Sequence, residues 1–180
     1  MHQITPFSST LWVFNLGFNY EAEVETCYKI KEKVASVHRS NVGGYQSDFI
    51  NLIDLFPCIS KKLFPILDAL AAQYKMQGSV NSAWLNINPK HTHNVCHTHS
   101  HGSLSGVLYL STNKKSGDIV FYNPAPIQHY PTLNQLPSFA SQHSFTPANG
   151  DVIIFPSYLE HCVMPNLSDE DRISIAFNIV

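Results

Sequence analysis

Histidines are concentrated in one short segment, residues 91–101. Of the ten histidines in the chain, five lie there: His91, His93, His97, His99 and His101. His97 and His99 are separated by one residue, so on a strand they point the same way, with α-carbons about 6.6 Å apart. With His161 from a distant strand, they could form a facial metal site with open coordination positions. Spacing alone does not distinguish this pair from His91 and His93, and histidine-rich tracts also occur as solvated or weakly metal-binding segments.

The last segment of the chain alternates cleanly between two faces. One face is apolar, with Ile173, Ile175, Phe177 and Ile179, and the other is polar or small, with Arg172, Ser174, Ala176 and Asn178. A polar strand face inside a β-sandwich usually lines a pocket, where an arginine is costly unless it meets an anion. The guanidinium of Arg172 suits a carboxylate held by two hydrogen bonds, and Ser174 can add a hydroxyl donor. Alternatively, Arg172 pairs with a neighbouring carboxylate: Asp169, Glu170 or Asp171.

The composition excludes several classes of protein. The chain of 180 residues is long enough for one domain with a sizeable core, and 44% of its residues are hydrophobic. Its net charge is -2 and only 13% of its residues are charged, against about 25% in typical domains, so it offers no basic surface for nucleic acid. No stretch approaches the roughly 20 apolar residues of a membrane span, and no signal peptide is evident. We therefore expect a cytoplasmic protein, or one of the host cytoplasm if a phage encodes it, and a homodimer is left open.

The cysteines do not suggest a metal or disulfide framework. Cys27, Cys58, Cys96 and Cys162 form no CxxC motif, and reduced thiols are expected in the cytoplasm. Cys96 and Cys162 each adjoin a histidine of the candidate site, but adjacent strand residues point to opposite faces. The cysteines are therefore not expected to be ligands of the candidate metal site.

Two helices are expected before the histidine-rich segment. An apolar run predicts a strand over residues 11–16, and apolar spacing predicts a helix over residues 21–38. A second helix is predicted from about residue 64 to 76, with Pro65 in its first turn.

Short β-rich runs dominate the rest of the chain. Five of them, separated by turn residues, predict a sandwich or barrel: 82–88, 104–110, 118–122, 151–155 and 172–180. Residues 124–148 hold five prolines and predict a long loop with little regular structure, which could serve as a lid. We expect a single domain, 1–180, with a strand and supporting helices in 1–80 and the β core with the metal site in 81–180.

A series of motifs follows in order between residues 97 and 178. They are His97-x-His99, Ser105-Gly-Val-Leu-Tyr-Leu110, Gly117-Asp-Ile-Val-Phe121, Pro147-x-x-Gly150-Asp-Val-Ile-Ile-Phe-Pro-Ser157-x-x-x-His161-x-Val163 and Arg172-x-Ser174-x-x-Phe177-Asn178. In this arrangement the chain resembles the Fe(II)/2-oxoglutarate-dependent oxygenases. It is most similar to the 2OG-Fe(II) oxygenase group of bacteria and phages, which is related to prolyl hydroxylases. The resemblance covers roughly residues 82–180 and is densest from Gly150 to Asn178.

The resemblance implies a fold, two cofactors and a set of roles. The fold would be mainly β, a double-stranded β-helix (a cupin-like jelly roll) with helices on one sheet. His97 and His161 match two Fe(II) ligands of the family motif HxD/E…H. Arg172 matches the residue that binds the far carboxylate of the co-substrate 2-oxoglutarate. Ser174 and Tyr109 match residues that contact the same carboxylate in some members. The implied activity is a dioxygenase that hydroxylates an unknown substrate and releases succinate and CO2.

One position departs from the family motif. His99 stands where the family has a carboxylate, so either three histidines bind the metal or a ligand comes from elsewhere. The nearest carboxylates, Asp118, Asp151 and Glu160, are not at the right spacing. A cupin-like three-histidine dioxygenase without 2-oxoglutarate would explain His99 but leaves Arg172 and Ser174 without a role. A non-catalytic jelly-roll module that binds a metal or a carboxylate is the third possibility, and halogenase chemistry is remote because His99 would fill the halide position.

Overall fold

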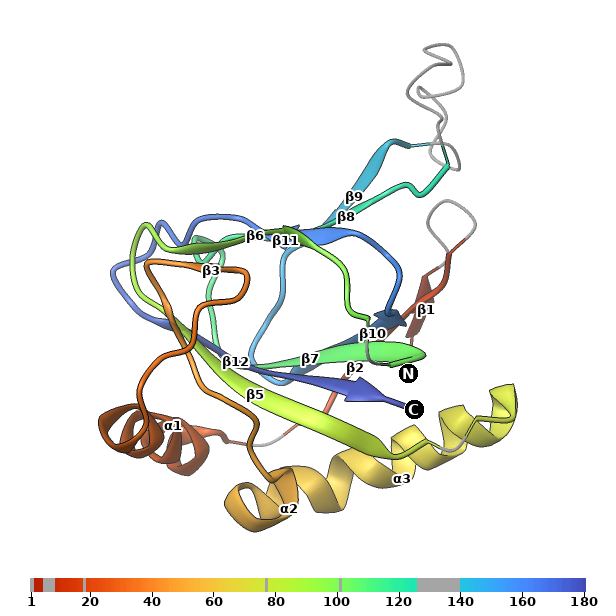
Figure 1. Cartoon of the computed structure of the whole chain (residues 1–180), viewed down its shortest axis with the longest axis horizontal. Coiled ribbons are helices and arrows are strands. Elements are labelled where there is room, and N and C mark those ends of the chain that lie inside the picture. The colour runs from red at the N-terminus through yellow and green to blue at the C-terminus, as the bar shows by residue number, and fades with distance from the viewer. Residues whose placement is uncertain (1, 5–8, 18, 77, 101, 126–139) are drawn as a thin grey trace.

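Two antiparallel β-sheets face each other in the computed structural model, which describes residues 2–4, 9–17, 19–76, 78–100, 102–125 and 140–180 (Figure 1). The strands are β1 (His2–Ile4), β2 (Leu11–Asn15), β3 (Asn41–Val42), β4 (Tyr45–Gln46), β5 (Val80–Asn88), β6 (His93–His97), β7 (Leu104–Ser111), β8 (Ile119–Tyr122), β9 (Gln142–Phe145), β10 (Asp151–Pro156), β11 (His161–Val163) and β12 (Arg172–Ile179). The larger sheet has the order β1-β2-β10-β7-β12-β5-β4 and the smaller one the order β3-β6-β11-β8-β9. Because the chain passes repeatedly from one sheet to the other after β5, the fold is the predicted jelly roll, which is confirmed.

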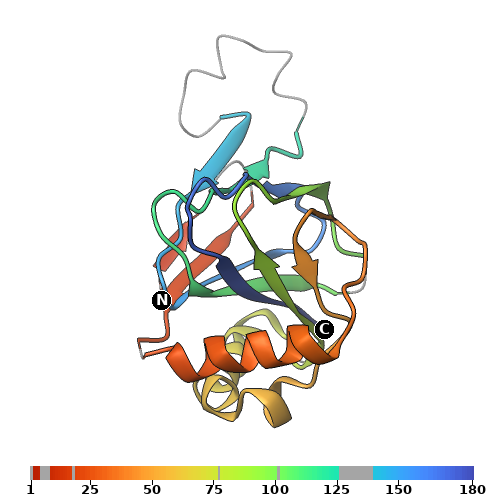
Figure 2. The ribbon, with the colours of Figure 1, turned by 90° about the vertical axis from the view of Figure 1, so that its left-hand side faces the viewer.

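The helices cover the outer face of the larger sheet, as Figures 1 and 2 show. They are α1 (Glu21–Lys33), α2 (Leu52–Leu55) and α3 (Pro57–Tyr74). Residues Ile59, Leu63, Leu67 and Leu70 of α3 recur at intervals of three or four and are buried against the sheet. Among the described residues, no helix combines the length and the apolar character needed to cross a membrane.

The helix boundaries differ from the predicted ones. Helix α1 ends at Lys33 rather than near residue 38, because Val34 is extended and the N–H of Val37 donates to the carbonyl of Gln46 at 2.9 Å. Helix α3 begins at Pro57, seven residues before the predicted start. Pro65 therefore lies inside the helix, on its exposed side, where water can take the place of the missing N–H donor.

The N-terminal region contributes more to the sheets than the one strand expected there. Among the described residues, β1 to β4 all come from the first 80 residues and join both sheets. The predicted loop 124–148 also holds regular structure, since β9 pairs antiparallel with β8. Long-range pairing specifies this strand, and local composition does not reveal it. Residues 126–139 lie outside the described part of the chain, so the lid stays a prediction.

The larger sheet separates two apolar cores. Its inner strands alternate, so that Leu108 and Ile154 face the helices while Val107 and Ile153 face the smaller sheet. Strand β12 follows the predicted alternation: its isoleucines and Phe177 belong to the helix-side core, whereas Arg172 and Ser174 face a cavity between the sheets. The space between the sheets is therefore part apolar core and part polar cavity.

Candidate metal centre

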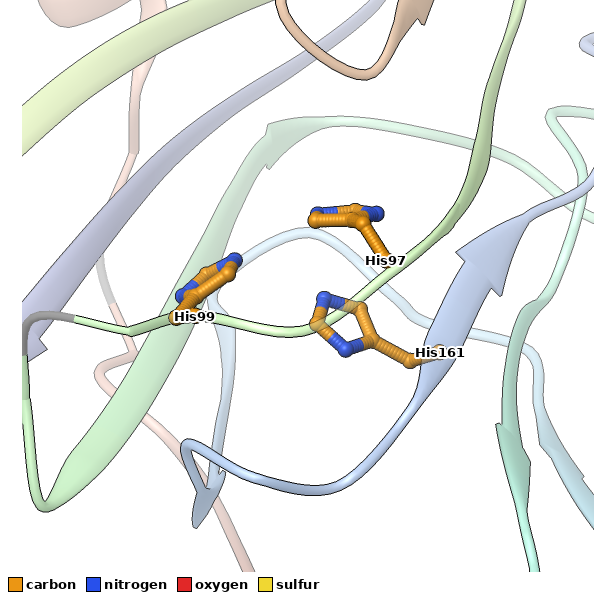
Figure 3. A group of neighbouring side chains, drawn as sticks. All are labelled: His97, His99 and His161. Carbon is orange, nitrogen blue, oxygen red and sulfur yellow. The ribbon is translucent and has the colours of Figure 1, made fainter.

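Three histidines meet at one end of the space between the sheets (Figure 3). His97 is the last residue of β6 and pairs across the ladder with His161, the first residue of β11; His99 follows β6. One ring nitrogen of each histidine lies within 4.8 Å of the others. In the described part of the chain this is the one group of three or more histidine, cysteine or acidic side chains close enough to share a metal ion.

The second nitrogen of each ring has a partner of its own. Nδ1 of His97 lies 2.8 Å from the carbonyl of Val95, and Nδ1 of His161 lies 2.9 Å from the carbonyl of Leu159. A carbonyl oxygen only accepts hydrogen bonds, so each Nδ1 carries the proton and each Nε2 keeps a lone pair for a metal.

A network of polar side chains holds His99. Its Nδ1 lies 2.8 Å from Oδ1 of Asn178 and 2.7 Å from Oγ of Ser105. The network follows from strand register, because Asn178 on β12 lies between Ser105 on β7 and Ser82 on β5. The Asn178 amide donates to Ser82 Oγ at 3.0 Å, and Ser105 also contacts Ser157 Oγ at 2.8 Å. The amide oxygen thus faces His99, and all three Nε2 atoms are available to one ion.

Burial keeps the three imidazoles neutral. It lowers the pKa of His97, and it lowers the pKa of His99 to about 4 and that of His161 to about 3. The neighbouring histidines act in the same direction at His99 and His161, because a second positive charge nearby is unfavourable. Neutral imidazole is the form that binds a transition metal, so the site is ready to bind a metal at pH 7.

None of the alternative carboxylates reaches this site. Asp118 accepts a hydrogen bond from Thr146 at 2.7 Å, and Asp151 accepts one from Asn15 at 2.9 Å. Glu160 is exposed and does not join the described histidine cluster. The structure therefore favours three histidines over a carboxylate supplied from one of these positions.

Arg172 lies between the sheets and is only 1% exposed. Its Nη1 donates to the backbone carbonyls of Ser116 and Met164. Its Nη2 is buried and has no hydrogen-bond partner among the described residues, and the same is true of the Tyr109 hydroxyl. Burial lowers the pKa of Arg172 and raises that of Tyr109, and the guanidinium charge opposes the second effect. Two buried donors thus lack an acceptor.

The predicted alternative, an ion pair of Arg172 with an adjacent carboxylate, is wrong. Asp169 pairs with Lys90 at 2.6 Å, and the other two carboxylates accept hydrogen bonds elsewhere: Glu170 from Asn113 at 3.1 Å and Asp171 from Tyr28 at 3.0 Å. The strand turns Arg172 inward, whereas these three side chains remain near the surface.

One cavity of about 50 Å³ connects the histidines with the unpartnered donors. Its lining includes the three histidines, Arg172, Tyr109 and Ser174, and Ser174 lies directly opposite Tyr109 in the ladder between β12 and β7. Three neutral nitrogen donors suit Fe(II), and buried donors without acceptors suit an anion. The residues present therefore fit Fe(II) together with a carboxylate ligand.

The remaining histidines of the tract lie elsewhere. His91 and His93 are not members of the described cluster; His93 pairs with Val42 at the start of β6. His101 lies outside the described residues. The positioning role of Asn178 was not predicted, although its place on the polar face of the last strand was a signal. Ser157 carried no such signal, because its contact with Ser105 joins residues far apart in the sequence.

Comparisons with known proteins agree with this geometry. A family model described as "Putative 2OG-Fe(II) oxygenase" matches residues 82–178, and no curated protein matches the chain in sequence. A prolyl-4-hydroxylase from Pseudomonas putida is similar in structure (TM-score 0.64, 15% identity, 94% of this chain and 91% of that one). So is a Trichoplax adhaerens prolyl hydroxylase solved with a peptide fragment of a hypoxia inducible factor (TM-score 0.64, 13% identity, 94% and 82%). HygX from Streptomyces hygroscopicus, solved with nickel and 2-oxoglutarate, also matches (TM-score 0.58, 15% identity, 93% and 81%).

At these identities the structural matches establish the fold alone, whereas the family model covers more than half of the chain. The cofactors expected from the sequence, Fe(II) and 2-oxoglutarate, are those of the matched family. The three histidines supply a site that could hold the iron. The chain therefore belongs to the 2OG-Fe(II) oxygenase family.

Proposed function

We propose that this protein hydroxylates an organic substrate at a metal ion held by His97, His99 and His161, and releases succinate and CO2 from 2-oxoglutarate. The observation that carries the proposal is the pair of unpartnered buried donors, Arg172 Nη2 and the Tyr109 hydroxyl, in the same cavity as the histidines. When bound, Fe(II) supplies oxygen activation coupled to decarboxylation of the co-substrate.

The residues at the far end of the cavity would bind the far carboxylate of 2-oxoglutarate. Nη1 of Arg172 is held by backbone carbonyls, so the guanidinium plane is fixed and Nη2 can donate to a ligand. The Tyr109 hydroxyl can donate to the same group, and Ser174 lies opposite Tyr109 to add a third donor. A buried carboxylate needs such donors, and here they would gain the acceptor that they lack.

The prime substrate would enter by a second, open groove of about 850 Å³. His97 and His99 line both the cavity and this groove, so a substrate in the groove would approach the metal from the side away from Arg172. Trp84 lines both the cavity and the groove, and its ring centroid lies 5.4 Å from that of His99 and 6.4 Å from that of Phe49. Phe49 is 66% exposed, so the two aromatic rings offer an apolar wall beside the histidines.

The test is binding and turnover of 2-oxoglutarate by the Fe(II)-loaded protein. We expect the visible charge-transfer band of the ternary complex, uncoupled formation of succinate, and binding measurable by calorimetry. Arg172→Ala loses the charge-assisted contact, which contributes roughly 1.5–3 kcal/mol of binding free energy. The affinity for 2-oxoglutarate should therefore fall by about one to two orders of magnitude. Arg172→Lys keeps the positive charge but not the two-pronged guanidinium, so its affinity for 2-oxoglutarate should lie between those of the wild-type protein and Arg172→Ala.

The other arginine of the chain, Arg39, provides the matched control. It lines the groove and not the cavity, so Arg39→Ala should leave 2-oxoglutarate affinity unchanged. Metal content should be the same in all these proteins, because neither arginine is a ligand. Equal 2-oxoglutarate affinity in the wild-type protein and Arg172→Ala would contradict the proposal and favour a three-histidine dioxygenase without this co-substrate. Binding without any turnover would favour a non-catalytic module.

A further inference from the structure

Two cysteines lie directly behind the metal centre, on neighbouring strands. His97 on β6 pairs with His161 on β11, and one step along each strand are Cys96 and Cys162. Adjacent residues on a strand point to opposite faces, so Cys162 lies on the face of the smaller sheet opposite to His161. Cys96 lines the open groove beside His97. The cysteines are not needed for metal binding and call for a separate explanation.

The register of β6 and β11 places the two cysteines opposite each other, next to a bulge in β6. The register shifts between His161 and Val163, because Val163 pairs with Asn94 rather than with Val95. Val95 and Cys96 therefore both lie opposite Cys162, which is the arrangement of a β-bulge. Directly opposed residues of antiparallel strands have α-carbons about 4.5–5.5 Å apart, and a disulfide needs about 4.4–6.8 Å. The backbone thus places the two thiols within disulfide range.

Tyr122 lies beside the pair. The hydroxyl of Tyr122 lies 3.4 Å from Cys162 Sγ, and the nearby Cys96 thiol raises the pKa of both groups. Tyr122 lies on β8, the other neighbour of β11. The contact with Cys162 and the opposed register of the two cysteines place Tyr122, Cys96 and Cys162 in one cluster.

The two thiols differ in access to solvent. Cys96 is exposed, whereas Cys162 is 7% exposed. An oxidant in solution would therefore reach Cys96 first, and Cys162 would be positioned to react with the product. This division between an exposed attacking thiol and a nearby resolving thiol is typical of reversible redox sites.

We propose that Cys96 and Cys162 form a redox-active pair that hydrogen peroxide converts to a disulfide across β6 and β11. The sulfur of Cys96 attacks peroxide, the O–O bond breaks, and a sulfenic acid and one water are formed. The sulfur of Cys162 then attacks that sulfur, an S–S bond forms, the S–O bond breaks, and a second water leaves. Two thiols are oxidised by two electrons and one peroxide is reduced to two waters.

The test uses the metal-free, full-length protein, so its outcome does not depend on iron, 2-oxoglutarate or the proposed hydroxylation. The protein is treated with an equimolar amount of hydrogen peroxide, remaining thiols are alkylated, and the peptides are mapped by mass spectrometry. We expect loss of two hydrogens from the intact chain and a peptide pair linked through Cys96 and Cys162, reversed by dithiothreitol.

Cysteine variants provide the controls. Cys58→Ser removes the other exposed thiol and should leave the yield of the disulfide unchanged. Cys162→Ser should abolish it and leave a sulfenic acid on Cys96 that dimedone traps. Full alkylation of both Cys96 and Cys162 in the treated wild-type protein would overturn the proposal. So would disulfides that join Cys96 to Cys58 or to a second chain.

Discussion

The two ends of the cavity satisfy their polar groups in opposite ways. At the histidine end, each Nδ1 already has an oxygen acceptor, and His99 is held by Asn178 and Ser105. At the other end, Arg172 Nη2 and the Tyr109 hydroxyl are buried without an acceptor. The first end is pre-organised by the protein itself, whereas the second needs a ligand to be complete.

This difference separates two kinds of free energy. Partnered groups contribute to folding and fix the direction of the metal-binding nitrogens before any ion arrives. Unpartnered buried donors cost stability in the free protein, and that cost is recovered when an anion binds. Substitutions at the two ends should therefore affect different measurements.

The largest effect is expected at the histidine end, from His161→Ala. Removing a residue that is hydrogen-bonded to a metal ligand typically lowers metal affinity by about 10–100-fold. Removing the ligand itself should therefore lower Fe(II) affinity by more than about 100-fold. Equilibrium titration with Fe(II) under anaerobic conditions measures this. His93→Ala, which changes a histidine outside the cluster, should keep full metal stoichiometry. A metal bound by His91 and His93 would refute the assignment.

A smaller loss in metal affinity is expected from Asn178→Ala, which removes the amide oxygen that faces His99, leaves Ser105 Oγ as its other neighbour, and does not touch the metal. The free imidazole could then adopt either tautomer, and metal affinity should fall by about tenfold. Ser82→Ala leaves Oδ1 of Asn178 in place, so its metal affinity should fall less than that of Asn178→Ala. NMR detection of the His99 Nδ1–H in the metal-free protein distinguishes tautomer control from general loosening. Unchanged affinity in Asn178→Ala would show that the network does not organise the ligand.

A still smaller change is expected from His99→Asp, which restores the HxD…H pattern. If His99 is a ligand, an aspartate there should retain or improve Fe(II) binding, because a carboxylate replaces a neutral donor, and Asn178 can turn its amide to donate to it. His99→Ala is the control and should weaken binding. Equal Fe(II) affinity in the wild-type protein and His99→Ala would show that His99 points away from the metal.

The smallest effect tests the comparison through stability alone. Tyr109→Phe removes a buried hydroxyl without a described partner, and with it the cost of burying that group, so the free energy of unfolding of the metal-free protein should not fall and should rise by roughly 0.5–2 kcal/mol. Ser105→Ala removes a hydroxyl from the His99 network and should cost about 1–3 kcal/mol. Urea unfolding measures both. A large destabilisation by Tyr109→Phe would mean that the hydroxyl is already satisfied in the free protein.

Local patterns predicted the parts of the site that one strand or one motif defines. The alternation around Arg172 and Ser174 located the polar face, and the motif order located His97 and His161. The partner of Arg172 could not be predicted, because three carboxylates precede it in the sequence and only their tertiary positions show that they bind elsewhere. The choice between three histidine ligands and two histidines with a carboxylate likewise needed the tertiary positions of distant carboxylates.

The fold shows the same limit. Long apolar runs identified the central strands, while β9 and the short strands β3 and β4 depend on partners far along the chain. The predicted start of α3 is wrong because Pro57, and not Pro65, occupies the first turn of the helix. The bulge in β6 arises from register with β11, which no local pattern encodes.

The alternation of β12 has a consequence for how such a protein can diversify. One face of the strand packs under the helices and the other lines the cavity, with each residue committed to one side. Mutations that repack the helix-side core can therefore accumulate while the chemistry is preserved, and changes in the cavity can alter specificity while the scaffold is preserved. Selection can act on the two faces as nearly separate traits encoded in a single stretch of eight residues.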